Sequence, residues 1–297
     1  MSTFKNVAVA GATGNLGPAI VKALVDAGFQ VIALSRSGKT EGLPSRVKTV
    51  KVDYDSKDSI TKALKENNID AFVSNVPNHD SQPALIDAAI AAGVKRFLPS
   101  DFGSNVSGNA LTAKLPVFAG KLLTHEYLKR KESEIEWTII ANGVFLDWGL
   151  EKGFLINKHG GPTQLFDDPN NKFSATTLAD VGKAVAGVLK HPAETKNRSV
   201  FVQSTSISQN ELLAIAKKVK PELKIETENV STAEVLKNSY GLLEKGEEIM
   251  GAMFGFLKVS IFGREYGSDL SGENDNELLG IKELTPKELE EVVRENL

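Results

Sequence analysis

The sequence predicts an α/β fold built on a parallel β-sheet. In the first half of the 297 residues, short β-branched runs alternate with longer helical patterns, which is typical of repeated βαβ units. A glycine-rich turn joins the first of these runs to the first helical pattern. The composition agrees with a globular protein, because 41% of the residues are hydrophobic and 25% are charged.

The predicted strands and helices follow one another in a regular order. The runs that predict strands are Val7–Ala10, Gln30–Leu34, Val47–Val52, Ala71–Ser74, Arg96–Leu98 and Trp137–Ile140. The helical patterns between them cover Leu16–Ala27, Ser56–Glu66, Gln82–Ala92 and Thr112–Lys131. After Val144 the pattern is harder to read. Residues 157–171 are rich in Gly, Pro, Asn and Asp and predict a loop or hairpin. They are followed by a predicted helix (Ala179–Leu189), a predicted strand (Ser199–Gln203) and a mostly helical remainder.

Charge and composition exclude several classes of function. The chain has 35 basic and 38 acidic residues, a net charge of −3, and so lacks the basic footprint of a protein that binds nucleic acid or an acidic membrane. It contains no cysteine, which excludes disulfides and thiolate chemistry. The four histidines are dispersed, so we expect no metal, and no Gly-x-Ser-x-Gly elbow indicates a serine hydrolase. No apolar run approaches the roughly 18 residues of a membrane span, and we expect a cytoplasmic protein.

The first glycine-rich turn has the features of a dinucleotide-binding loop. It reads Gly11-Ala-Thr-Gly14-Asn-Leu-Gly17, directly after the first strand and at the start of the first helix. Gly11 permits the tight turn, Gly14 lets backbone N–H groups approach a pyrophosphate, and Gly17 allows close packing of helix and strand. The helix N-terminus also favours a phosphate. The residues expected to bind the cofactor here are Gly11, Thr13, Gly14, Asn15, Leu16 and Gly17, with Asn75 after the fourth strand. The alternative is an ordinary βα turn.

The segment after the second strand favours NADP(H) over NAD(H). An NAD site places Asp or Glu about 20 residues beyond the glycines to bind the ribose. Here residues 34–39 read Leu-Ser-Arg-Ser-Gly-Lys, without a carboxylate. Arg36 can instead bind a 2′-phosphate through its forked donors, assisted by Ser35 or Lys39, although a plain surface arginine is the alternative. Asp53 and Tyr54 fall where the adenine edge would lie, and Asp53 is equally expected as a turn residue.

Three blocks together carry a resemblance to a known family. They are the glycine turn, the Arg-Phe-Leu-Pro-Ser-Asp-Phe-Gly run at residues 96–103, and the Trp-Thr-Ile-Ile strand at residues 137–140. In these the chain resembles the NmrA-like and isoflavone-reductase-like branch of the atypical short-chain dehydrogenases/reductases. The resemblance implies a Rossmann-type, doubly wound parallel sheet that binds NADPH, formed by residues 1–150 with a later contribution near 175–203. It also implies a smaller C-terminal α+β substrate domain, mainly residues 151–297.

The resemblance further implies a catalytic lysine on the helix before the sixth strand. Lys121 fits that place, with Lys114 as the alternative because the spacing from Lys121 to Thr138 is longer than in the family pattern. Such an ammonium could bind the nicotinamide ribose, deliver a proton or stabilise an oxyanion. His125 lies one turn further on the same helical face and could assist proton delivery, or it is a plain core histidine. The pair Tyr127 and Lys131 copies an ordinary short-chain dehydrogenase motif, but it lies too close to the following strand.

Aromatic residues after two strands are expected to line a substrate pocket. Phe102 follows Ser100 and Asp101 at the end of the fifth strand, and Phe145 and Trp148 follow the sixth. The resemblance places Phe145 near the nicotinamide, whereas plain core packing is the alternative for the aromatic residues and a capping role is the alternative for Asp101.

These observations predict an NADPH-dependent reductase. It would transfer hydride to a small, aromatic or polyketide-like secondary metabolite, with Lys121 handling the proton or the developing charge. The alternatives are an NmrA-like redox sensor that binds dinucleotide without turnover, and a cofactor-bound cyclase or isomerase. We expect a monomer or homodimer whose partner is the small-molecule substrate.

Overall fold

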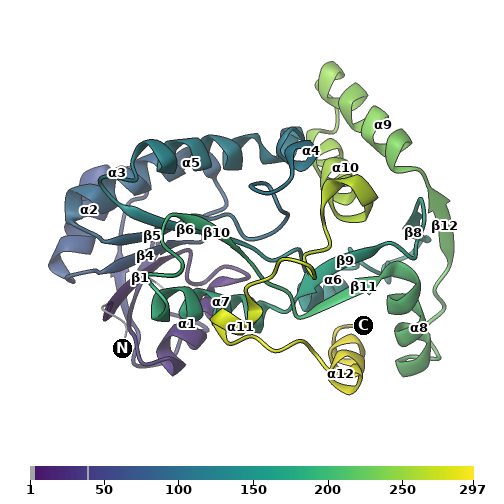
Figure 1. The fold of residues 1–297 in the computed structure, drawn as a ribbon, viewed down its shortest axis with the longest axis horizontal. Coiled ribbons are helices and arrows are strands. Elements are labelled where there is room, and N and C mark those ends of the chain that lie inside the picture. The colour runs from purple at the N-terminus through teal and green to yellow at the C-terminus, as the bar shows by residue number, and fades with distance from the viewer. Residues whose placement is uncertain (1–3, 39) are drawn as a thin grey trace.

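A seven-stranded, fully parallel sheet forms the centre of the computed structural model, which describes residues 4–38 and 40–297 (Figure 1). Its order is β10-β6-β5-β4-β1-β2-β3. The strands are β1 (Asn6–Ala10), β2 (Gln30–Ser35), β3 (Lys48–Lys51), β4 (Ala71–Ser74), β5 (Arg96–Leu98), β6 (Glu136–Ala141) and β10 (Arg198–Phe201). The α/β fold expected from the sequence is therefore confirmed.

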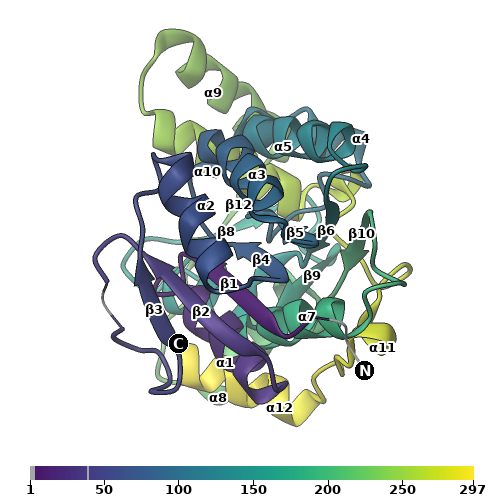
Figure 2. The same ribbon diagram turned by 90° about the vertical axis from the view of Figure 1, so that its left-hand side faces the viewer.

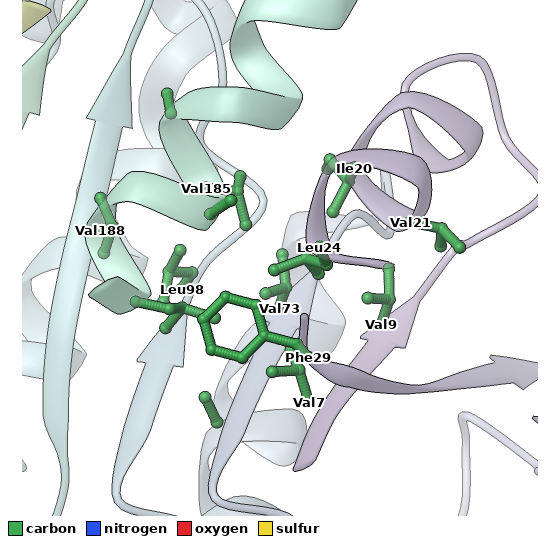
Figure 3. Close-up of a cluster of buried hydrophobic side chains, with 14 of the residues drawn as sticks. Val7, Val9, Ile20, Val21, Leu24, Phe29, Val73, Leu98, Val185 and Val188 are labelled. Carbon is green, nitrogen blue, oxygen red and sulfur yellow. The ribbon is translucent and has the colours of Figure 1, made fainter. Parts of the chain in front are cut away.

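Helices cover both faces of this sheet (Figure 1). One face carries α1 (Gly17–Asp26) and α7 (Leu178–Lys190), and the other carries α2 (Lys57–Glu66), α3 (Gln82–Ala92) and α5 (Ala119–Arg130). Figure 3 shows the first of these interfaces, where Leu24 and Val185 reach toward Val73 and Leu98 of the sheet. Burial on both faces explains why the strands are nearly continuous apolar runs, and it makes the sheet doubly wound, as expected.

A second region is built around two small sheets (Figures 1 and 2). One has the order β11 (Thr205–Ser208), β9 (Lys172–Thr176), β7 (Val144–Phe145), and the other pairs β12 (Thr227–Val230) with β8 (Thr163–Phe166). Their apolar sides share a core with α6 (Leu146–Glu151), α8 (Gln209–Val219), α10 (Ile249–Phe262) and α12 (Pro286–Asn296). The remaining helices are η1 (His79–Ser81), α4 (Ala110–Ala113), η2 (Pro116–Phe118), α9 (Thr232–Lys245), η3 (Arg264–Tyr266) and α11 (Asn276–Leu279).

The chain does not complete the large sheet before it enters the second region. Along the chain, β7, β8 and β9 of the second region come before α7, which packs on α1, and before β10, which pairs with β6. The late contribution expected near residues 175–203 corresponds in place to α7 and β10. The division into a cofactor domain and a substrate domain remains a prediction.

Two elements differ from the sequence-based prediction. The single helix expected over Thr112–Lys131 is broken into α4, η2 and α5. Pro116 causes the break, because it has no N–H and its ring clashes with the preceding helical turn. The loop or hairpin expected at 157–171 contains β8, whose partner is the distant β12 rather than the next strand, and such a long-range pairing leaves no local signal.

The sheet order creates a crevice between β1 and β4. These neighbours connect onward in opposite directions, and ligands of open α/β sheets bind where the strand order reverses, beyond the carboxyl ends. The N–H of Asn75 donates to the carbonyl of Ala10 at 3.0 Å and ties the two strand ends together. Among residues 4–38 and 40–297, no helix has the length and apolar character needed to span a bilayer.

Candidate cofactor and substrate site

The three loop glycines have different structural reasons to be glycine. Gly11 has a φ of 71°, and a Cβ there would lie 2.3 Å from the carbonyl oxygen of Asn75. A Cβ on Gly17 would lie 2.3 Å from the carbonyl oxygen of Gly11. At Gly14 the nearest atom would be 3.4 Å away, which is ordinary van der Waals contact, and the residue is exposed. Gly11 and Gly17 are therefore required by the packing of the protein, whereas Gly14 leaves room for a ligand.

The surface over this loop fits a pyrophosphate. Thr13, Gly14 and Asn15 are exposed, and the N-cap residue of α1, Leu16, has no side-chain hydrogen bond to the first helical turn. The first N–H groups of the helix are therefore free of a side-chain cap, and the positive end of the helix dipole adds to their attraction for an anion. The Leu16 side chain is buried in the core, so its backbone is the part that can take part.

The residues expected to recognise the adenosine half lie along the same edge. Arg36 is exposed just beyond β2, and the buried Ser35 hydroxyl accepts the N–H of Gly38 at 3.1 Å. Lys39 lies outside the described residues. The carboxylate of Asp53 accepts the N–H of Asp55 at 3.0 Å, which is the geometry of a turn. Arg36 thus combines charge and accessibility, while Asp53 has a local structural function.

Lys121 is buried at the start of α5 and points toward the loop after β5. Its Nζ donates to the backbone carbonyl of Asp101 at 2.6 Å and to that of Phe102 at 3.4 Å. Gly103, with a φ of 144°, leaves room for the ammonium, since a Cβ there would lie 3.4 Å from Nζ. Burial lowers the pKa of Lys121 below its ordinary value of 10.5, and the nearby Asp101 partly opposes this effect.

The side chain of Asp101 hydrogen-bonds to His125 and lies at a longer, ion-pair distance from the lysine. Its Oδ2 lies within hydrogen-bond distance of His125 Nε2, both residues are buried, and Oδ1 is 3.9 Å from Lys121 Nζ. His79, on η1, lies against Gly120 of α5. Burial and the positive charge of Lys121 lower the pKa of His79. Asp101 therefore makes a buried carboxylate–imidazole contact, and not the capping contact that was the alternative expected from the sequence.

An apolar cavity of about 230 Å³ adjoins Lys121. Its walls come from the loop after β5, from the start of α5, from α6 and from α10. The described aromatic side chains in these walls are Phe102, Phe118, Phe145, Trp148, Phe154 and Phe254. Among the described lining residues, Lys121 is the one that carries a charge. A flat, largely apolar molecule with an oxygen at one end would suit this lining.

The structure brings most, but not all, of the expected substrate-site residues together. Phe102, Phe145 and Trp148 line the cavity with Lys121. His125 does not line it, because its ring faces Asp101. Lys114, the alternative lysine, is exposed at the end of α4 and is also outside the lining.

Sequence reasoning missed the walls contributed from outside the predicted motifs. Phe118 precedes α5, Phe154 follows α6, and Phe254 lies on α10, far beyond both in the sequence. The all-round apolar sequence of Ile249–Phe262 is the signal that could have indicated a helix with more than one packed face. In the part of the chain that the structure describes, no cluster of His, Asp and Glu has the make-up of a metal site.

Comparisons with known proteins agree with this geometry. The model of the NmrA-like family matches residues 3–291. The oxidoreductase aprR of Aspergillus flavus is 35% identical over 217 residues, which cover 72% of this chain and 73% of that protein. The solved structure described as AtPrR2 with NADP+ and (+)pinoresinol matches with a TM-score of 0.79 at 23% identity, over 100% of both chains. An isoflavone reductase matches with a TM-score of 0.77 at 21% identity, over 99% of this chain and 100% of that one. At these identities, the two solved structures show the shared fold.

Proposed function

The chain belongs to the NmrA-like family, and on that premise we propose that it is an NADPH-dependent reductase of small, aromatic or polyketide-like molecules. The family match covers nearly the whole chain, and the relative from Aspergillus flavus is named an oxidoreductase. The neighbour with the (+)pinoresinol ligand is an example of a related fold with NADP+ and an aromatic compound.

The observation that carries the proposal is the position of Lys121. A buried lysine at the polar end of an aromatic cavity lies beyond the carboxyl end of β5, and the glycine loop lies beyond the carboxyl end of β1. In a parallel sheet both ends open on the same edge. The cofactor loop and the cavity therefore lie near the same end of the strands, which is a requirement for hydride transfer between two bound molecules.

The residues of the cofactor edge would hold NADPH as follows. The N–H groups at the start of α1 and the open surface over Gly14 receive the pyrophosphate. Arg36 pairs with the 2′-phosphate through its forked donors. When bound, NADPH supplies the hydride.

Lys121 would act on the oxygen of the substrate. Of the three hydrogens on its ammonium, one is directed to Asp101 and one to Phe102, which leaves one donor for a ligand in the cavity. That donor can stabilise the negative charge that develops on a carbonyl oxygen, or deliver a proton to it. The lowered pKa makes the ammonium a stronger acid, and the burial of Lys121 limits the water that would compete for it.

The test begins with cofactor binding. We expect calorimetric titration to give clearly tighter binding of NADPH than of NADH, and this preference should fall about 10- to 100-fold in Arg36→Ala. A panel of aromatic and polyketide-like enones and ketones is then screened for NADPH consumption, with product analysis. Equal binding of the two cofactors would contradict the role of Arg36. Tight NADPH binding with no consumption across the panel would contradict the reductase and favour a sensor.

A further inference from the structure

A tyrosine hydroxyl lies at the point where β1 and β2 stop pairing. The last paired residues are Ala10 and Leu34, and beyond them the chains diverge into the glycine loop and the Arg36 loop. Between them, Tyr54 Oη accepts the N–H of Gly11 at 3.2 Å and donates to the carbonyl of Leu34 at 2.8 Å. One hydroxyl thus binds both the N–H of Gly11 in the glycine loop and the carbonyl of Leu34 in β2.

The tyrosine itself is firmly placed. Its ring packs against the core formed on the α2 and α3 side of the sheet. Next to it, the N–H of Val52 donates to the carbonyl of Ser35 at 3.0 Å, which fixes the end of β3 against β2. Burial raises the pKa of Tyr54 to about 12, so the phenol keeps its hydrogen at every ordinary pH. The phenol therefore remains neutral and can donate its hydrogen to Leu34 throughout that pH range.

Gly11 is held from its other side as well. Its carbonyl oxygen accepts the N–H of Gly14 at 3.1 Å and the side-chain amide of Asn75 at 3.3 Å. The peptide units on both sides of Gly11 are therefore fixed, one by Tyr54 from the end of β3 and one by Asn75 from the end of β4. Because φ at Gly11 is 71°, a small rotation there would redirect the loop up to Gly14.

We propose that Tyr54 is a positioning residue that sets the dinucleotide loop through Gly11 and thereby strengthens the binding of NADPH and NADH by the same factor. The inference rests on the proposed cofactor site. A direct contact with the 2′-phosphate is the competing role, since the charge of Arg36 is felt at Tyr54. The hydroxyl has a single hydrogen, however, and it is directed to Leu34, so none is left for a phosphate.

The experiment compares Tyr54→Phe with two other variants by titration with NADPH and with NADH. Tyr54→Phe should weaken the binding of both by about three- to tenfold, which is the range expected for one hydrogen bond. Arg36→Ala should weaken NADPH alone. Tyr127→Phe is the matched control: it also removes a tyrosine hydroxyl, which donates to Asp87 at 2.6 Å on the α3–α5 face, and it should leave both affinities unchanged.

Amide hydrogen exchange of the cofactor-free proteins supplies a second measurement. Tyr54→Phe should speed exchange in the segment that spans Gly11 to Gly17, and Tyr127→Phe should not. Selective loss of NADPH binding in Tyr54→Phe would overturn the inference in favour of a phosphate contact. Unchanged affinities, or unchanged exchange in the loop, would overturn it outright. If the unaltered protein binds neither cofactor, the proposed function fails and so does the effect on affinity, whereas the exchange data still decide whether Tyr54 sets the loop.

Discussion

The cofactor edge and the substrate cavity are built in contrasting ways. The cofactor edge uses backbone groups and exposed side chains from consecutive turns of a regular sheet, with Gly14 and Arg36 open to solvent. The cavity uses apolar side chains from segments far apart in the sequence, such as the half-buried Phe102 and the exposed Phe254, around one buried charge. A polar, local site can bind a common cofactor in many related proteins, whereas a site assembled over long range is free to change its specificity.

The largest difference is expected when the buried charge is removed. Lys121→Met should lower turnover by about 100- to 10,000-fold, the range of a lost proton donor or oxyanion partner, while NADPH binding remains. Steady-state kinetics and calorimetry measure the two effects. Lys114→Met is the matched control, because Lys114 is exposed and outside the cavity, and its turnover should be unchanged. Equal losses in both variants would remove Lys121 from the chemistry.

Next in size is the effect of separating Asp101 from His125. His125→Leu removes the hydrogen-bond partner of a buried carboxylate and leaves it only the more distant ammonium of Lys121, so the free energy of unfolding should fall by about 3 kcal/mol. Adding Asp101→Asn to His125→Leu should restore part of that loss, because a neutral amide costs less to bury than a carboxylate that has lost its hydrogen-bond partner. Denaturant titration measures both variants, and His159→Leu, at an exposed position, serves as the control. A loss in His125→Leu no greater than that of the control would show that the contact contributes little to stability.

Two glycines of the same loop should respond differently. Gly17→Ala places a Cβ 2.3 Å from a backbone oxygen, and we expect a loss of about 1–3 kcal/mol in stability. Gly14→Ala meets no atom closer than 3.4 Å, so its melting temperature should stay near that of the unaltered protein while cofactor affinity falls. Thermal unfolding and calorimetry separate the two outcomes. A stable Gly17→Ala protein would mean that the start of the helix can move away from the loop backbone at Gly11 and Ala12.

The smallest effect concerns pH. If the ammonium of Lys121 is the active form, turnover at saturating substrate should fall tenfold per pH unit above its lowered pKa, and the fall should therefore begin below pH 10.5. Below that pKa the ammonium is present and the rate is level. Cofactor affinity should not follow the same curve, since the pKa of Tyr54 is about 12. A pH–rate profile that stays flat to pH 10.5 would contradict a lysine whose pKa is lowered.

The sequence predicted the local features of the molecule, but not the contacts between segments far apart in the chain. The parallel sheet was predictable because each strand and each helix carries its own pattern, and the glycine loop because its three glycines lie close together between a strand pattern and a helical pattern. The Tyr54 bridge and the Asp101–His125 contact were not, because each joins residues from different segments that only the folded chain brings together. Phe254 was not predicted to line the cavity, because the sequence of its helix does not indicate which part of the chain packs against it.

The path of the chain between the two regions has a consequence for how the molecule can be divided. A fragment ending near residue 150 would lack α7 and β10, and would expose the apolar surface of α1 and the edge of β6 to water. Such a fragment would be prone to aggregate rather than to fold. During synthesis, β7, β8 and β9 of the second region are made before α7 and β10, which complete the large sheet. We therefore expect the two regions to lose structure in a single cooperative transition, with late completion of the sheet slowing the folding of both.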